Sequence, residues 1–218
     1  MTNIRISVIS AGLSQPSTTR LLADRLVTAA DTELTSAGRT TSFEIFELRD
    51  YAHDLVNKLL TGFPSGQIGP MLDQVTTADG LIVVTPVFNA SYSGLFKMFF
   101  DVLPPDSLNH KPILIGATAG TERHSLALDY VIRPMFCYLR AAAAPTSVFA
   151  ASEDWGPSRE QQQGELSDRI TRAAVEFSDL IVYRRASETR DPYTDPIPFS
   201  QLLPDVVATQ ASAMEPEW

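Results

Sequence analysis

The stretch LIVVTPVFNASYSGLFKMFFD, residues 81–101, decides the fold. Residues 81–85 form an apolar run rich in β-branched side chains, which is typical of a strand buried on both faces. Pro86 is expected to end this strand, and residues 87–93 to form a loop. Gly94 then opens a predicted helix, because apolar side chains recur at helical spacing from Leu95 to Val102. The loop therefore lies at the carboxyl end of a buried parallel strand, where open α/β sheets bind their ligands.

The side chains of this loop suit a flat heteroaromatic ligand. Phe88 and Tyr92 offer ring faces. Asn89 can donate and accept hydrogen bonds at once, as a mixed edge such as an isoalloxazine pyrimidine requires. The alternative is an ordinary strand-to-helix connection, in which Ser93 and Gly94 only start the helix.

Length and composition indicate one sizeable core and exclude several classes of protein. The chain has 218 residues, of which 44% are hydrophobic, and a formal net charge of -9. With this negative net charge, the chain lacks the excess of basic residues that is typical of a nucleic-acid-binding protein. No run of about 18 apolar residues predicts a membrane span, and no signal segment is visible at the start. Cys137 is the only cysteine and the three histidines are far apart, so we expect no disulfide, no metal site and a cytoplasmic protein.

Strand and helix patterns alternate along the chain. Predicted strands cover residues 4–10, 43–48, 81–85, 112–118 and 146–150, and predicted helices cover 18–38, 53–60, 70–78, 94–102, 125–139 and 159–183. This alternation predicts an α/β fold with a five-stranded parallel sheet between helices, most often in the doubly wound order 2-1-3-4-5. The loops after strands 1, 3 and 4 then meet in one crevice. We expect one domain over residues 1–185 and a Pro-rich extension over 186–218, which is either a docking segment or a mobile tail.

The loop after the first strand, SAGLSQPSTTR (residues 10–20), lacks the usual dinucleotide and triphosphate motifs. It holds a single glycine, Gly12, and the nearest acidic candidate for a ribose contact is Glu47. Hydroxyls instead precede a predicted helix start, where they and free backbone N–H groups can cradle a terminal phosphate. These hydroxyls belong to Ser10, Ser14, Ser17, Thr18 and Thr19. The alternative is that Ser17 or Thr18 is a plain N-cap.

The loop after the fourth strand, ATAGTERHSL (residues 117–126), combines small residues with two cationic candidates. Thr118, Ala119 and Gly120 permit a ligand to approach the backbone closely. Arg123 can meet a phosphate of a pyridine nucleotide or a surface carboxylate. His124 can bind the ligand or cap its own helix. Further along that helix, Cys137 is expected to be a small buried apolar residue.

Together the three loops make the chain resemble the NAD(P)H-dependent FMN reductases of the flavodoxin-like superfamily. The pattern T-P-x-[YF]-N-x-S-x-x-G-x-x-K-x-x-x-D is met by Thr85, Pro86, Phe88, Asn89, Ser91, Gly94, Lys97 and Asp101. The first loop is similar to the pattern Gly-Ser-x-Arg-x-x-Ser and departs from it, since Ala11 and Gly12 replace Gly-Ser and Ser14 replaces Arg. The third loop resembles the subgroup that works beside luciferase-like monooxygenases. The resemblance covers residues 4–183.

This resemblance implies a three-layer flavodoxin-like fold and a site for FMN. The FMN phosphate is expected on Ser10, Gly12, Ser14, Ser17, Thr18 and Thr19. The isoalloxazine ring is expected against Pro86, Val87, Phe88, Asn89, Ser91, Thr118, Ala119 and Gly120. NAD(P)H is expected to meet Arg123 and His124 and to pass a hydride from its C4 to flavin N5. No side chain acts as a catalyst, because the cofactor carries the chemistry.

The resemblance also implies partners. Reduced FMN is expected to leave for a flavin-dependent monooxygenase, and the chain to form a homodimer or homotetramer. Lys97 and Asp101 are expected to be structural or interface residues. Two alternatives stay open: a quinone or azo reductase that keeps FMN bound, and a flavodoxin-like electron carrier without pyridine-nucleotide turnover. The small residues of the first and third loops favour an enzyme, because they leave the ring open to a second substrate. The choice between NADH and NADPH is not decided.

Overall fold

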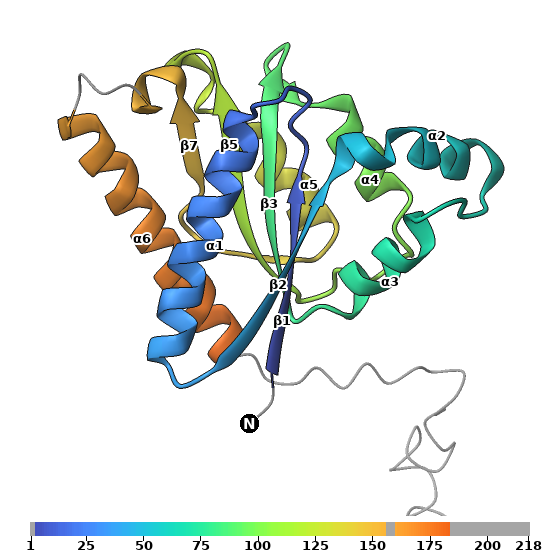
Figure 1. Ribbon diagram of the computed structural model, residues 1–218, viewed down its shortest axis with the longest axis horizontal. Helices are drawn as coiled ribbons and strands as arrows, with labels where there is room; N and C mark the ends of the chain where they lie inside the picture. Colours follow the sequence, from blue (N-terminus) through green and yellow to red (C-terminus); the bar gives the residue numbers. More distant parts are fainter. Residues whose placement is uncertain (1–2, 156–159, 184–218) are drawn as a thin grey trace, which may run out of the picture. The chain divides into compact units, whose positions relative to one another are not determined.

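A parallel sheet forms the centre of the molecule (Figure 1). The computed structural model describes residues 3–155 and 160–183. The predicted extension, residues 186–218, lies outside the described residues. Strands β1 (Asn3–Ser10), β2 (Thr40–Glu47), β3 (Gly80–Phe88), β5 (Pro112–Ala119) and β6 (Ala142–Ala143) follow the order β2-β1-β3-β5-β6. Strand β7 (Val148–Ala151) also pairs with β5, and β4 (Ser91–Tyr92) pairs with β3. The predicted parallel α/β sheet is therefore confirmed.

The predicted number of five strands is wrong, because the sheet has seven. The position beside β5 is shared by two short strands in parallel register. Strand β6 pairs with the start of β5 at Pro112 and Ile113, and β7 pairs with its end from Gly116 onward. The residues between β6 and β7 leave the sheet, so one predicted strand is replaced by two. The other additional strand, β4, comes from the segment that was predicted to be a loop.

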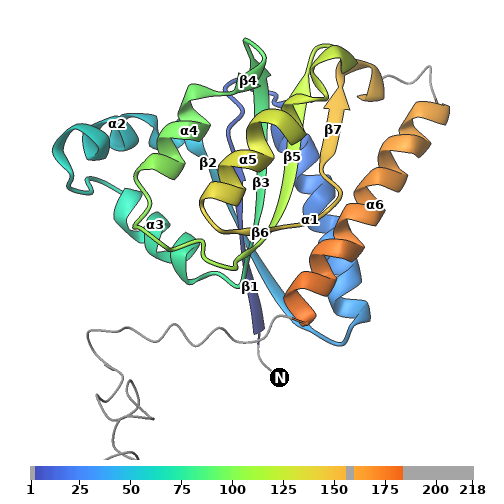
Figure 2. The same cartoon turned by 180° about the vertical axis from the view of Figure 1, so that it is seen from behind.

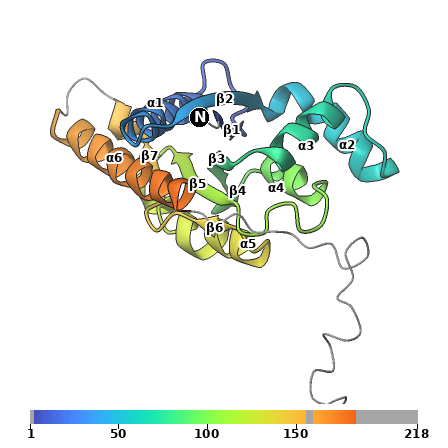
Figure 3. The ribbon, with the colours of Figure 1, turned by 90° about the horizontal axis from the view of Figure 1, so that it is seen from below.

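Helices cover both faces of the sheet and make it the middle of three layers. Helices α1 (Thr18–Ser36) and α6 (Glu160–Val182) lie on the face toward the viewer in Figure 1. Helices α2 (Ala52–Thr61), α3 (Ile68–Thr77), α4 (Gly94–Asp101) and α5 (Arg133–Tyr138) lie on the face seen in Figure 2. Figure 3 shows the layers from below. Successive strand residues point to opposite faces, so Val8 packs in the α1/α6 core and Ile9 in the α2–α5 core.

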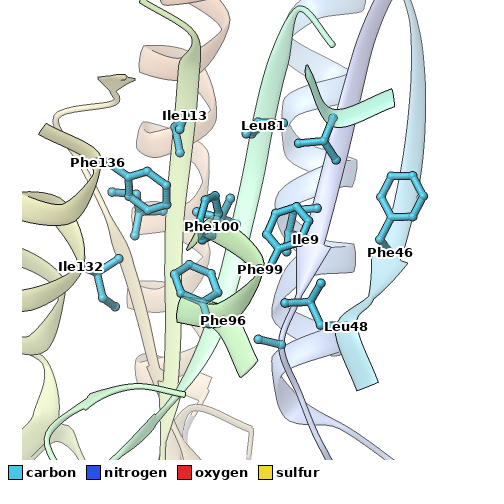
Figure 4. Packing of buried hydrophobic residues seen from close by; sticks show 14 of the residues in the cluster. Ile9, Phe46, Leu48, Leu81, Phe96, Phe99, Phe100, Ile113, Ile132 and Phe136 are labelled. Carbon is cyan, nitrogen blue, oxygen red and sulfur yellow. The ribbon is translucent and has the colours of Figure 1, made fainter. Parts of the chain in front are cut away.

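Phenylalanine rings fill the core beneath α4 and α5 (Figure 4). Phe96, Phe99 and Phe136 are 0% exposed. The ring centroids of Phe100 and Phe136 are 5.0 Å apart at 89°, and those of Phe96 and Phe100 are 4.8 Å apart at 60°. Edge-to-face arrangements of this kind add to the free energy gained by burying the rings. The layer fixes α4 and α5 against the strands whose ends carry the predicted ligand loops.

The helix predicted over residues 125–139 is broken into pieces. A 3-10 turn η2 (Glu122–His124) comes first, then a π-helical turn η3 (Leu128–Ile132), then α5. A π turn widens the helix by one residue per turn, is rare, and often occurs at functional sites. Cys137 is exposed in α5, so its predicted burial is wrong. Among the described residues, no helix combines the length and apolar character needed to span a bilayer.

Candidate functional site

The three loops singled out from the sequence meet at one edge of the sheet. In the parallel register, Ser10 of β1 lies beside Val84 of β3, and Pro86 of β3 beside Thr118 of β5. The carboxyl ends of the three central strands are therefore level with one another. The amide of Ala11 continues this pairing by donating to the carbonyl of Val84 at 2.9 Å. The loops that follow therefore lie at one edge of the sheet, which is where open α/β sheets bind their ligands.

The first loop is wrapped tightly around the start of α1. Ser17 is the N-cap, and its Oγ accepts a hydrogen bond from the amide of Arg20 at 3.2 Å. A Cβ on Gly12 would lie 2.1 Å from Ser17 Oγ and 3.1 Å from the Cβ of Thr19, so only glycine fits there. Ser10 is 1% exposed, and its Oγ has no hydrogen-bond partner among the described residues. Ser14 and Thr18 are exposed at the rim.

A hydrogen bond joins the first loop to the third. Thr19 Oγ1 and Thr118 Oγ1 are 2.9 Å apart, and both residues are 3% exposed. Thr19 belongs to the first turn of α1, and Thr118 is the second-last residue of β5. The two residues are 99 positions apart in the sequence. Two of the predicted site residues thus form one buried connection across the edge of the sheet.

The second loop is a tight hairpin rather than an open loop. Strand β3 continues through Pro86 to Phe88, so Pro86 does not end it, and β4 pairs with it antiparallel. Asn89 (φ 50°) and Ala90 (φ 63°) form the tip with left-handed backbones, as the central residues of a type I′ turn must. Asparagine is one of the residues that adopts this conformation readily. Asn89 therefore has a structural role in the turn beside any role in binding.

Buried hydroxyls hold the base of this hairpin. Thr85 is 0% exposed, and its Oγ1 donates to the carbonyl of Pro86 at 2.9 Å and accepts from the amide of Ser93 at 3.1 Å. Ser93 is the N-cap of α4, and its Oγ accepts from the amide of Phe96 at 3.2 Å. The tip projects from this base, and Phe88 is 46% exposed.

The third loop leaves open space at the end of β5. A Cβ on Gly120 would meet nothing within 4 Å. Arg123 and His124 are exposed on η2, and no side-chain hydrogen bond from His124 caps that turn. They line a hollow of about 370 Å³ together with Ala90 of the hairpin tip. The rest of its lining is Leu126, Ala127, Tyr130 and Val131. The structure thus brings the two cationic candidates next to the hairpin.

Ion pairs lie beside the first loop, and sequence reasoning missed them. Glu47 accepts from Arg20 Nη1 at 2.7 Å and lies 2.5 Å from Arg49 Nη2, so it pairs with two guanidinium groups. Arg49 Nη1 also donates to the carbonyl of Ser14 at 2.7 Å. A hydrogen bond to Asp24, with a smaller contribution from Glu47, raises the pKa of Arg20 above its usual value. The sequence signal for this cluster was Arg49, which stands two residues after the last residue of β2.

Lys97 and Asp101, which belong to the sequence pattern, form an ion pair one turn apart on α4. Their Nζ and Oδ1 atoms are 2.5 Å apart. This hydrogen bond raises the pKa of Lys97 above its usual value. Both side chains are more than 40% exposed, at 42% and 43%, so the pair stabilises the helix surface and does not enter the crevice.

The arrangement fits a ligand with a phosphate at one end and a flat ring at the other. The first turn of α1 has amides without partners inside the helix, and these bind anions. Next to them is the close packing of Gly12 against Ser17 and Thr19, which we call the glycine cradle. The Oγ of Ser10, which has no hydrogen-bond partner among the described residues, also lies in this loop. The hairpin and the small residues after β5 form the two walls on which a ring can lie. Both features fit FMN.

Known proteins are similar to this chain in sequence and in fold. The sequence model of the NADPH-dependent FMN reductase family matches residues 4–156, a range that contains all three loops. An FMN reductase (NADPH) of Pseudomonas aeruginosa is 34% identical over 176 residues, 81% of this chain and 91% of that protein. The NADH-dependent FMN reductase SfnE of Pseudomonas putida is 33% identical over 173 residues, 79% of this chain and 90% of that protein. An oxidoreductase structure from Corynebacterium diphtheriae has a TM-score of 0.80 and 44% identity, and covers 84% of this chain and 98% of that chain.

Proposed function

The chain belongs to the NADPH-dependent FMN reductase family, and on this premise we propose that it reduces FMN with a hydride taken from NADPH or NADH. When bound, FMN supplies the redox chemistry, because its N5 accepts the hydride from C4 of the nicotinamide and a solvent proton completes its reduction. The protein contributes the positions of the two rings. The observation that carries the proposal is the meeting of the glycine cradle, the hairpin and the open third loop at one edge of the sheet.

The phosphate end of the site is assigned to the first loop and the start of α1. We propose that the phosphate accepts hydrogen bonds from the hydroxyls of Ser10, Ser14, Ser17, Thr18 and Thr19 and from nearby amides. The tight packing of Gly12 against Ser17 supports this, because it shapes the loop around the helix start. The helix N-terminus adds a favourable electrostatic field for the anion.

The ring is assigned to the wall between the hairpin and the end of β5. We propose that it lies against Pro86, Val87, Phe88, Asn89 and Ser91 on one side. On the other side it meets Thr118, Ala119 and Gly120, where the absence of any atom within 4 Å of a Cβ on Gly120 supports a close approach. Arg123 and His124 then bind the phosphates of the nicotinamide dinucleotide, since both line the exposed hollow beside the hairpin tip.

The first experiment is the oxidation of NADPH and of NADH by the purified full chain, with and without added FMN. We expect rapid consumption that depends on FMN. FMN binding without consumption would contradict the reductase and would point to an electron carrier. If added quinone rather than FMN sustains turnover, the protein is a reductase that keeps its flavin bound. No FMN binding at all would contradict the site itself.

Asn89 has two roles that a pair of variants separates. Asn89→Ala removes the amide and also disfavours the left-handed backbone, whereas Asn89→Gly removes the amide alone. If the amide binds the ring edge, both variants weaken FMN binding, by about 1–3 kcal/mol for a lost buried partner. The measurement is the FMN dissociation constant from flavin fluorescence. An Asn89→Gly protein that binds FMN like the wild type would remove Asn89 from the site.

The receiver of the reduced flavin is proposed to be a luciferase-like monooxygenase. The support is the third loop, in which Gly120 is followed by Arg123 and His124, as in the subgroup that works beside such enzymes. An exposed ring binding site also suits a reductase that gives up its product. The cytoplasm, which supplies reduced nicotinamide, is the compartment that we propose, and residues 1–185 are the proposed FMN-binding domain.

A second copy of the chain is proposed to cover the π-helical segment. Leu126 and Tyr130, which are 64% and 76% exposed, line the hollow beside the hairpin tip, and Tyr138, at the end of α5, is 86% exposed. Large apolar side chains gathered on one surface mark contacts with other proteins. Burying them against a second copy forms a dimer or tetramer whose interface borders the flavin site.

A charge placed at this surface tests the assembly. Tyr130→Lys is expected to lower the mass measured by light scattering to that of a smaller assembly, because a lysine is costly to bury in an apolar interface. Leu60→Lys, at a side chain that is 78% exposed on α2, is the matched control and is expected to leave the mass unchanged. A wild-type chain that is already monomeric would contradict the proposal.

A further inference from the structure

The proposed phosphate loop carries no cationic side chain before Arg20, and the Arg20 guanidinium is paired with Asp24 and Glu47. Between Ser10 and Thr19 the sequence is SAGLSQPSTT, which contains no lysine or arginine. A phosphate monoester carries roughly −1.5 to −2 charges near neutral pH, and guanidinium groups bind it through paired N–H donors. The arginine of the family pattern is replaced here by Ser14. Any unpaired side-chain cation for the phosphate therefore comes from outside residues 10–20, and it would add to the hydroxyls and amides of the loop.

Arg49 reaches this loop from the end of β2. Its Nη1 donates to the carbonyl of Ser14 at 2.7 Å, so the guanidinium contacts the very residue that replaces the pattern's arginine. Its side chain is only 17% exposed. Its buried Nε has no hydrogen-bond partner within the described part of the chain, and the nearest carboxylate oxygen, Asp50 Oδ1, is 3.6 Å away. A buried charged donor without a partner is costly, and a ligand anion would satisfy it.

The neighbouring charges distinguish Arg49 from Arg20. Arg20 lies between two carboxylates, with Nε 2.8 Å from Asp24 and Nη1 2.7 Å from Glu47. Arg49 shares Glu47 with Arg20 and faces Asp50 only at the longer distance. Glu47 therefore holds the Arg49 guanidinium in place, and the second carboxylate near Arg49, Asp50, is 65% exposed to solvent. The Arg49 guanidinium donates to the carbonyl of Ser14 in the loop, whereas Arg20 contacts the loop through its backbone amide, which donates to Ser17 Oγ.

We propose that Arg49 is the cationic member of the FMN phosphate subsite and stands in for the arginine that the loop lacks. This inference rests on the proposed function, which puts the phosphate in the first loop. The guanidinium group clamps the loop through Ser14 and offers its unpaired Nε–H and its charge to the phosphate. Glu47 is the positioning residue that keeps it there.

The test compares FMN with riboflavin, which lacks the phosphate. Arg49→Gln is expected to weaken FMN binding about tenfold to a hundredfold and to change riboflavin binding less than about twofold, as the loss of one charged hydrogen-bonding group predicts. Arg49→Lys keeps the charge and is expected to recover part of the FMN affinity. Salt is expected to weaken FMN binding to the wild type and to have much less effect on Arg49→Gln. Flavin fluorescence reports the affinities of the wild type and both variants for the two flavins without turnover.

Arg20→Gln is the matched control, because it also removes one guanidinium from Glu47, while the Arg20 side chain pairs with Asp24 and Glu47 and only the backbone amide, which the substitution keeps, bonds to Ser17 of the loop. It is expected to leave the ratio of FMN to riboflavin affinity unchanged. If Arg49→Gln loses FMN and riboflavin affinity equally, or loses neither, the proposed role of Arg49 is overturned and the phosphate site itself is not. A wild-type protein that does not prefer FMN to riboflavin would instead overturn the phosphate site of the proposed function. If Arg49→Gln does not fold, the Arg49→Lys affinities and the salt dependence of the wild type decide between these outcomes.

Discussion

Gly12→Ala is expected to weaken FMN binding by about 2–3 kcal/mol, roughly thirtyfold to 150-fold, which is the loss of a hydrogen bond to a charged group. The new Cβ would lie 2.1 Å from Ser17 Oγ, so that oxygen must rotate away. It then leaves the amide of Arg20 and the proposed phosphate together. The loss of the N-cap is expected to lower the free energy of unfolding by about 1 kcal/mol. FMN titration and urea unfolding measure the two effects separately.

Gly69→Ala is the matched control for this substitution. The nearest atom to a Cβ on Gly69, in α3, is 3.5 Å away, which is an ordinary contact. This variant is expected to bind FMN normally and to be slightly more stable, because alanine favours a helix. Normal FMN affinity in Gly12→Ala would show that the cradle beside Ser17 does not hold the flavin.

Phe136→Ala is expected to lower the free energy of unfolding by about 3–5 kcal/mol, which is the usual cost of removing a buried phenylalanine. The side chain is 0% exposed and makes edge contacts with Phe96 and Phe100, at centroid distances of 6.2 Å and 5.0 Å. Its removal leaves a cavity between α4 and α5, and both helices follow ligand loops. Because the free energy of unfolding of a domain is only about 5–15 kcal/mol, this substitution is expected to remove a large part of it.

Urea unfolding of the full chain measures the change, and Phe63→Ala is the control. Phe63 is 76% exposed, so its removal is expected to alter the free energy of unfolding by less than about 0.5 kcal/mol. Equal effects of the two substitutions would contradict the assignment of Phe136 to the core.

The parts of the fold that follow from hydrophobic patterning were predictable. The apolar run from Leu81 to Val84 is buried in β3, and the helix that Gly94 opens is α4. Ser17 also caps α1, as the hydroxyl before a helical pattern indicated. Patterns of this kind depend on local spacing, and tertiary packing supports them here. The meeting of the three loops followed from the parallel alternation alone.

The remaining features depend on contacts that no local pattern contains. The hairpin was missed because Asn89 is followed by alanine, and the usual signal for a type I′ turn is asparagine followed by glycine. The π turn depends on how Leu128 and Ile132 pack into the core rather than on propensity. Cys137 was expected to be buried because its neighbours are apolar, yet it lies on the outer face of α5. Arg49 was missed because its contact with Ser14 spans 35 residues.

The hydroxyl pair of Thr19 and Thr118 has a kinetic consequence for an enzyme that releases its flavin. The pair joins the first loop to the third by a buried hydrogen bond, and neither of these loops needs the ligand to bring it into position. The two loops are therefore ordered when the chain folds, and flavin binding does not include the entropy cost of ordering them. The residence time of each flavin is then set by the contacts that break as it leaves, not by the opening of a loop. After each release, the next molecule of oxidised flavin meets a crevice of unchanged shape.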